Sequence, residues 1–204
     1  SPWDISKLNI SSLSISNTAS TVSADDDLEM CVGMMDQRGN SWSVDADWSI
    51  VGEPTGSSLT NSSGICTNFD GGLTGEYVVL AEHLTQEGST VNSSRSITVV
   101  PGRLATISLD GHATEMSIGE TYFIEPQGFD SGGNPVEVDA WNYSVIGPSE
   151  DAVAIYPDGT VFEPDVTGLH KIRASAAGRV AEINVEVFAG DPVTLMVVST
   201  EGET

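Results

Sequence analysis

The chain has 204 residues, with 30 acidic side chains against seven basic ones, for a formal net charge of -23. Such a surface repels nucleic acid and anionic membranes, and it suits salty water, where ions screen the self-repulsion. No stretch approaches the roughly 18 apolar residues of a membrane helix, and the first residues, 1–4, indicate a cut inside a longer chain rather than a signal peptide.

Short runs of Val, Ile, Thr, Ser and aromatic residues alternate with Gly, Pro, Asn and Asp along the whole chain. The first repeat is expected to have strands at 8–15 and 28–34, and a strand that carries tryptophans at 42–50. Helical periodicity is almost absent. Turns every eight to twelve residues are typical of an all-β sandwich.

A turn of the pattern Asp-x-x-Gly-Asn occurs twice, at 36–40 and at 130–134. Its Gly and Asn tolerate positive φ, and its Asp can accept hydrogen bonds from the amides that follow. Because the flanking strands recur as well, the pattern indicates two copies of one module, each large enough for its own core.

The strand after each turn differs between the two copies. In the first copy, alternation from Trp42 to Ile50 predicts five side chains that face one core. In the second copy an extra residue changes the parity, and we expect a β-bulge near Asp139–Asn142. Trp141 lies at this irregularity and is expected to point away from the core.

These boundaries predict a fold of two tandem Ig-like β-sandwiches, at 1–101 and 102–190, followed by a linker and the first strand of a third repeat at 191–204. The linkers have about two to four residues, which favours a semi-rigid connection. The terminal strand is an alternative assembly element that could complete a neighbouring molecule by strand addition. Its candidate residues are Val193, Leu195 and Val197.

Beyond the turn, the second copy contains Val153-Ala-Ile155, Asp158-Gly-Thr-Val161, a Thr-Gly strand start at 167 and a closing Val185-Glu-Val187. These features resemble the bacterial Ig-like repeats of invasin- and intimin-like surface proteins. The resemblance implies strings of extracellular β-sandwiches that serve as stalks, spacers or adhesive surfaces, and it supplies no catalytic residues.

Two cysteines, Cys31 and Cys66, favour one disulfide and an oxidising, extracellular compartment. The bridge would link neighbouring strands, or a strand and its adjoining loop, and would close a loop worth roughly 3–4 kcal/mol. Two buried free thiols are the alternative. Tyr77 is expected to form a tyrosine corner, with His170 as its structural substitute or as an exposed strand residue in the second copy.

Acidic side chains and sequons supply the remaining candidate sites. Calcium prefers six to eight oxygen ligands, but no EF-hand loop is present, so no cofactor is expected unless calcium binds among the acids. The calcium candidates are Asp45, Asp47, Asp130 and Asp139, with the run 25–27. The N-glycosylation candidates are Asn61 and Asn92, followed by Asn9 and Asn142.

The sequence therefore predicts a non-enzymatic, extracellular stalk or binding spacer of a multidomain surface protein. Its expected partners are a protein or glycan on a cell surface, or copies of itself, without nucleic acid or membrane insertion. A self-assembling filament or surface-layer subunit is the first alternative. An accessory carbohydrate-binding module, with Trp3 or Trp141 as its aromatic platform, is the second.

Overall fold

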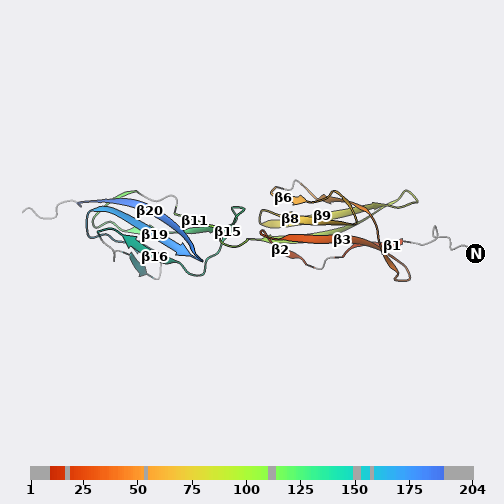
Figure 1. The fold of residues 1–204 in the computed structure, drawn as a ribbon, viewed down its shortest axis with the longest axis horizontal. Coiled ribbons are helices and arrows are strands. Elements are labelled where there is room, and N and C mark those ends of the chain that lie inside the picture. The colour runs from red at the N-terminus through yellow and green to blue at the C-terminus, as the bar shows by residue number, and fades with distance from the viewer. Residues whose placement is uncertain are drawn as a thin grey trace, which may run out of the picture. The chain divides into compact units, whose positions relative to one another are not determined.

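The structure is a computed structural model that describes residues 10–16, 19–52, 55–109, 114–148, 153–156 and 159–190. It divides into two compact units, each drawn in Figure 1. Unit 1 contains Ser1–Ala105 and Phe129–Val136, and unit 2 contains Thr106–Gly128 and Glu137–Thr204. The described residues form strands and turns without helix, and this confirms the all-β prediction. Accordingly, no described helix is long and apolar enough to cross a membrane.

Unit 1 is a sandwich of two sheets. The first sheet has the order β1-β3-β8-β6, with β4 paired to β3, and the second has the order β2-β10-β9-β5-β7. The strands of the first sheet are β1 (Ile10–Ile15), β3 (Asp27–Asp36), β4 (Ser41–Ser43), β6 (Ser57–Leu59) and β8 (Cys66–Gly71). Those of the second are β2 (Thr21–Ser23), β5 (Ala46–Ile50), β7 (Ser63–Gly64), β9 (Gly75–Leu84) and β10 (Thr90–Val100).

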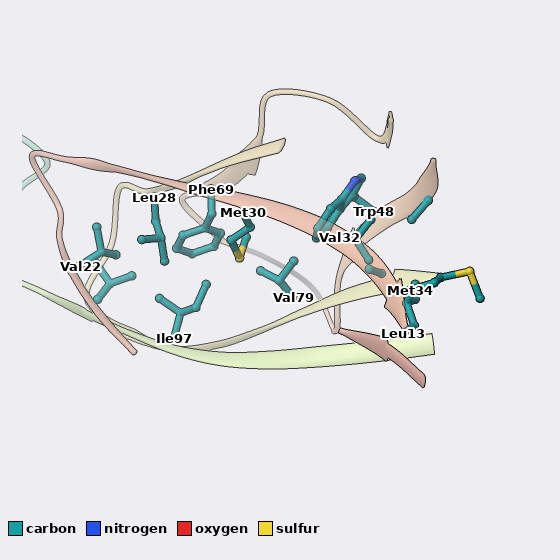
Figure 2. Close-up of a cluster of buried hydrophobic side chains, with 13 residues drawn as sticks. Leu13, Val22, Leu28, Met30, Val32, Met34, Trp48, Phe69, Val79 and Ile97 are labelled. Carbon is teal, nitrogen blue, oxygen red and sulfur yellow. The ribbon is translucent and has the colours of Figure 1, made fainter. Parts of the chain in front are cut away.

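The core of unit 1 follows the alternation of its strands. Along β3 every second residue from Leu28 to Met34 is buried, and these side chains meet those of β8, β9 and β10. Figure 2 shows Phe69, Met30 and Ile97 together in this core. Burying a side chain of this size stabilises a fold by about 1.5–3 kcal/mol, so the alternation largely sets which sheet faces meet.

The tryptophan-bearing strand of the first copy switches sheets. Its start, β4, pairs with β3, whereas its continuation, β5, pairs with β9 in the opposite sheet. Trp48 is buried, but Trp42 is 36% exposed, so the prediction that all five alternating side chains face the core is wrong at Trp42. The alternation holds from Val44 to Ile50, after the chain has left the first sheet.

Unit 2 contains one sheet of order β12-β20-β19-β16 and one of order β13-β18-β17. Outside these two sheets, the chain forms a further sheet of order β11-β14-β15, and β15 belongs to unit 1. These strands are β11 (Thr106–Ser108), β12 (Glu115–Ser117), β13 (Tyr122–Ile124), β14 (Gln127–Phe129), β15 (Pro135–Val136), β16 (Asn142–Ile146), β17 (Val153–Tyr156), β18 (Gly159–Phe162), β19 (Gly168–Ala176) and β20 (Arg179–Phe188). The core of unit 2 includes Phe162, Ile172 and Val185.

The predicted β-bulge near Asp139–Asn142 is wrong. Residues 137–141 belong to no strand, and they separate β15 from β16, which lie in different sheets. The change of parity is real, because Val145 is buried and Val136 and Val138 are half-buried. The parity changes because the chain leaves one sheet and enters another, so no extra residue is needed within a single pair of strands. Trp141, at the end of the break, is half-buried.

Candidate functional site

The Asp-x-x-Gly-Asn turn of the second repeat is built around the carboxylate of Asp130, which is 2% exposed. Its Oδ1 accepts hydrogen bonds from the backbone N–H of Gly132 (2.9 Å) and of Asn134 (2.8 Å). Gly133 has a φ of 85°, a conformation that glycine adopts without strain. This segment is therefore folded by side-chain to backbone hydrogen bonds within the turn, in place of backbone hydrogen bonds between paired strands.

Although the second repeat encodes this turn, the turn belongs to unit 1. Asn134 is 3% exposed and its side-chain amide is fully used. Its Nδ2 donates to the carbonyl of Gly72 and to Asp130 Oδ2, both at 2.9 Å. Its Oδ1 accepts from the backbone N–H of Thr74 at 2.9 Å. One asparagine therefore satisfies two backbone groups that precede β9.

Two carboxylates hold the segment that follows β10. The backbone N–H of Gly102 donates to Asp130 Oδ2 (2.8 Å), and that of Arg103 donates to Asp25 Oδ2 (2.7 Å). Ser131 Oγ donates to Asp25 Oδ1 at 3.2 Å. A Cβ on Gly102 would collide with the Asp25 carboxylate, so another residue there would have to displace the carboxylate that the Arg103 N–H holds. We call Asp25, Gly72–Thr74, Gly102–Arg103 and Asp130–Asn134 the clasp.

The carboxylates of the clasp are held in their charged form. Burial alone would raise the pKa of Asp130, but the N–H donors of Gly102, Asn134 and Gly132 outweigh burial and lower that pKa below its ordinary value. The backbone N–H of Arg103 contributes most to lowering the pKa of Asp25, with burial acting against it. Asp25 also faces the Arg103 guanidinium at 3.4 Å, although that side chain is almost fully exposed.

The turn of the first repeat has the same internal geometry and different surroundings. Asp36 Oδ1 accepts from the N–H groups of Arg38 and Asn40 at 2.8 Å, and Asn40 Nδ2 donates to Asp36 Oδ2 at 2.8 Å. The hydrogen bond from the Asn40 side chain contributes most to lowering the pKa of Asp36. Asn40 itself is exposed, whereas Asn134 is buried.

One position of the motif distinguishes the two turns. The third residue is Arg38 in the first copy and Gly132 in the second. A Cβ on Gly132 would lie 2.7 Å from the carbonyl oxygen of Gly72, closer than real Cβ contacts come. Nothing in the sequence marks this glycine as significant except its difference from Arg38 at the matching position of the other turn.

The structure contains the predicted disulfide between Cys31 and Cys66. The two residues lie opposite each other on β3 and β8, with a Cα–Cα distance of 4.0 Å. The bridge therefore links neighbouring strands, one of the two expected arrangements. Within the described ranges, the only group of three His, Cys, Asp or Glu residues with close ligand atoms is Glu29 with these cysteines. Because both sulfurs are bonded to each other, the group lacks the thiolates of a metal site.

The calcium candidates do not converge. Asp130 is buried with N–H donors on both oxygens, whereas Asp45, Asp47 and Asp139 are exposed. The backbone carbonyl of Asp45 contacts His83 Nδ1 at 2.6 Å. A calcium ion would have to displace the hydrogen bonds that fold the clasp, because it needs several free oxygen ligands.

The remaining predicted sites lie apart from the clasp. Asn61, Asn92 and Asn142 are exposed, on the approach to β7, on β10 and at the start of β16. Asn9, Trp3 and the assembly residues Val193, Leu195 and Val197 lie outside the described residues.

The two copies have different residues at the tyrosine-corner position, near the start of β9 and of β19. Tyr77 Oη donates to the carbonyl of Leu73 at 2.9 Å and lies 3.3 Å from the carbonyl of Thr55, which confirms the tyrosine corner. His170 occupies the same place in β19 with 0% exposure, and its Nδ1 lies 3.0 Å from the carbonyl of Gly168. His170 packs against the edge of Phe162 as Tyr77 packs against Phe69. It is therefore the structural substitute, not an exposed residue.

No protein-family model matches the sequence, and no curated protein matches it. Solved structures do match. The adhesin FdeC of Escherichia coli is 17% identical over 88% of this chain and 63% of its own, with a TM-score of 0.55. The surface-layer protein rSbsC(31-844) is 17% identical over 90% of this chain and 28% of its own, with a TM-score of 0.42. Titin domains I67–I69 are 13% identical over 88% and 66% of the two chains, with a TM-score of 0.41.

The chain spans less than a third of the first matched surface-layer protein and about two thirds of the adhesin chain. At such low identity, the likeness to FdeC shows the fold alone. Together with the sheet topology of the described residues, it shows that the chain is made of tandem Ig-like β-sandwiches, as the sequence predicted.

Proposed function

We propose that the chain is a non-catalytic segment of an extracellular surface protein and acts as a semi-rigid stalk or spacer for adhesion. The clasp is the observation that carries this proposal. It places a turn of the second repeat inside unit 1, so the chain passes from one unit to the other at Ala105–Thr106, Gly128–Phe129 and Val136–Glu137. We expect three crossings, two of which flank the hydrogen-bonded turn at Asp130–Asn134, to leave fewer free dihedral angles than one short linker.

Three further observations support the extracellular and structural parts of the proposal. The Cys31–Cys66 disulfide suits an oxidising compartment. The net charge of -23 keeps such a chain soluble in salt. The matched structures include a bacterial adhesin and a surface-layer protein. In this proposal the two repeats are of the bacterial Ig-like type, and their partner is a protein or glycan on a cell surface.

Backbone ¹⁵N relaxation tests the stiffness that the proposal requires. In the native chain, amides of unit 1 and unit 2 are expected to report one common rotational correlation time. Asn134→Ala removes three hydrogen bonds of the clasp and is expected to give the two units separate, shorter correlation times. Asn40→Ala, at the matching position of the exposed turn, is the control and is expected to leave the common value unchanged. Independent tumbling of the two units in the native chain would refute the stalk.

A further inference from the structure

The turn at residues 36–40 has the internal geometry of the clasp turn at Asp130–Asn134, and residues 37–40 of it are exposed. In both turns the backbone N–H of the aspartate donates to the carbonyl of the asparagine at 3.0 Å, and the glycine has a φ of 85°. Asn134 uses its side chain to bind the backbone before β9, whereas the side chain of Asn40 donates within its own turn. The first repeat therefore presents a preformed copy of a turn that, in the second repeat, binds a separate segment of the chain.

Unit 2 repeats the segment to which the clasp turn binds. Residues 69–75 lead into β9 and residues 162–168 lead into β19, and both segments start with a fully buried phenylalanine and end with Thr-Gly. The tyrosine-corner position follows two residues later in both, so the alignment has no gap. Thr167 therefore stands at the position of Thr74, whose N–H binds Asn134 in the clasp.

The end of β20 likewise matches the end of β10. The parallel pairs of β10 with β2 and of β20 with β12 end at Val100 and at Phe188, which makes these two residues equivalent. Two positions further on lie Gly102 and Gly190, and the N–H of Gly102 binds the clasp turn. We call residues 165–167 together with Gly190 the receptor site of unit 2.

The receptor site is more exposed than the segment that the clasp turn covers in unit 1. Gly72 and Leu73 are half-buried, whereas Asp165 and Val166, at the same positions, are exposed. Val166 is 42% exposed, and Met35, which precedes the first turn, is 39% exposed. A contact between the turn and the receptor site would cover both apolar side chains, as the centres of protein interfaces do.

Charge distinguishes the first turn and the receptor site from their counterparts in the clasp. The clasp brings Gly132 against Gly72, and a Cβ on Gly132 would lie 2.7 Å from the Gly72 carbonyl oxygen. At these positions the first turn has Arg38 and the receptor site has Asp165, and both are exposed. Glu163 adds a second negative charge two residues before Asp165. The glycine pair of the clasp is therefore replaced by residues of opposite charge, which suits a contact between two copies of this chain.

We propose that residues 36–40 of one copy bind the receptor site of unit 2 in a second copy, so that copies join head to tail. Asn40 takes the part that Asn134 has in the clasp and bonds the receptor backbone. Arg38 pairs with Asp165. Because Arg38 carries a Cβ, the turn docks farther from the backbone at that point than the clasp turn does, and the long side chain spans the added distance. The contact joins two different surfaces, so each copy keeps one of them for the next copy and the assembly can grow.

The proposed contact is weak because it is small. A few hydrogen bonds and one exposed ion pair correspond to a dissociation constant of about 1 mM, so a dilute solution contains the single chain. The stalk concerns the connection within that single chain, and relaxation measured in dilute solution reports it. The stalk and this inference can therefore fail separately.

Charge exchange between two variants of the full chain tests the proposal by NMR. In the native chain, the amides of residues 38–40, Thr167 and Gly190 are expected to shift together as the concentration rises to about 1 mM. Arg38→Glu and Asp165→Arg each place like charges at the contact, and each variant alone is expected to weaken association at least fivefold. Their mixture restores opposite charges at every contact and is expected to associate as the native chain does.

Two further chains keep the result from depending on one substitution. The chain that carries both Arg38→Glu and Asp165→Arg has opposite charges again and is expected to associate with itself. Arg179→Glu makes the same change of charge at the exposed hairpin between β19 and β20, and as the matched control it should associate as the native chain does. A native chain whose turn amides do not shift with concentration overturns the proposal. Association that Arg38→Glu leaves unchanged, or a mixture that associates no better than its components, overturns it as well.

Discussion

Replacing Asn134 with alanine is the most direct perturbation of the clasp. The side chain makes three hydrogen bonds, two of them to the backbone groups of Gly72 and Thr74 and one to the Asp130 carboxylate. Neutral bonds contribute about 1 kcal/mol each, and a bond to an ionised group contributes about 2 kcal/mol. Water can reach Thr74, which is exposed, so the expected loss for unit 1 is about 3 kcal/mol rather than the full sum.

Urea unfolding followed by NMR measures this loss in each unit separately. The methyl groups of Val79 and Ile97 report unit 1, and those of Ile172 and Val185 report unit 2. Separate reporters are needed because a two-unit chain need not unfold in one step. Asn40→Ala is the control, since Asn40 is exposed and makes its side-chain bond only within its own turn.

The two alanine variants should differ in stability. Asn134→Ala should lower the urea midpoint of the unit 1 signals clearly, and Asn40→Ala should lower it much less. Equal losses would mean that the bonds to Gly72 and Thr74 contribute nothing. A loss seen only in the unit 2 signals would mean that the turn does not belong to unit 1.

Three further outcomes are expected. Cys31→Ala with Cys66→Ala should destabilise unit 1 by roughly 3–4 kcal/mol in the same urea experiment, because the open loop regains its entropy in the unfolded state, and no change would contradict this. The lowered pKa of Asp130 stabilises the fold above pH 3.8, its ordinary value, and this contribution is lost as the pH falls below 3.8 toward the pKa of the folded state. Asp130→Asn should therefore be less stable at neutral pH and depend less on pH in acid titrations followed by circular dichroism, and a parallel pH curve would refute this. Gly132→Ala should destabilise unit 1 by about 1–3 kcal/mol in thermal unfolding, because its Cβ meets the Gly72 carbonyl, whereas Arg38→Ala should be neutral.

The sequence was sufficient to predict the sandwich because the core follows strand alternation. Leu28, Met30, Val32 and Met34 are buried as their period of two requires. Alternation failed where the chain changes sheets, at Trp42 and again between β15 and β16. A period reports which residues share a face, but it does not report which sheet that face belongs to.

The candidate site was only partly visible in the sequence. The turn at Asp130–Asn134 was found as a repeated pattern and interpreted as local architecture. Its partners Thr74, Gly72 and Asp25 are 60 to 106 positions away from the residues they bond, and only folding brings them to the turn. Backbone carbonyls and amides carry no sequence signature, so a site made mainly of them has no motif.

The clasp also governs when unit 1 can be completed during synthesis. The strands of its sandwich end at Val100, and the expected boundary at residue 101 would suggest that the first domain is finished there. Because Asp130–Asn134 must reach Gly72 and Gly102, unit 1 lacks its last hydrogen bonds until residue 136 has left the ribosome. A nascent chain whose first 110 residues have left the ribosome would still lack the hydrogen bonds from Asp130–Asn134, and a fragment cut at residue 101 would lack them permanently.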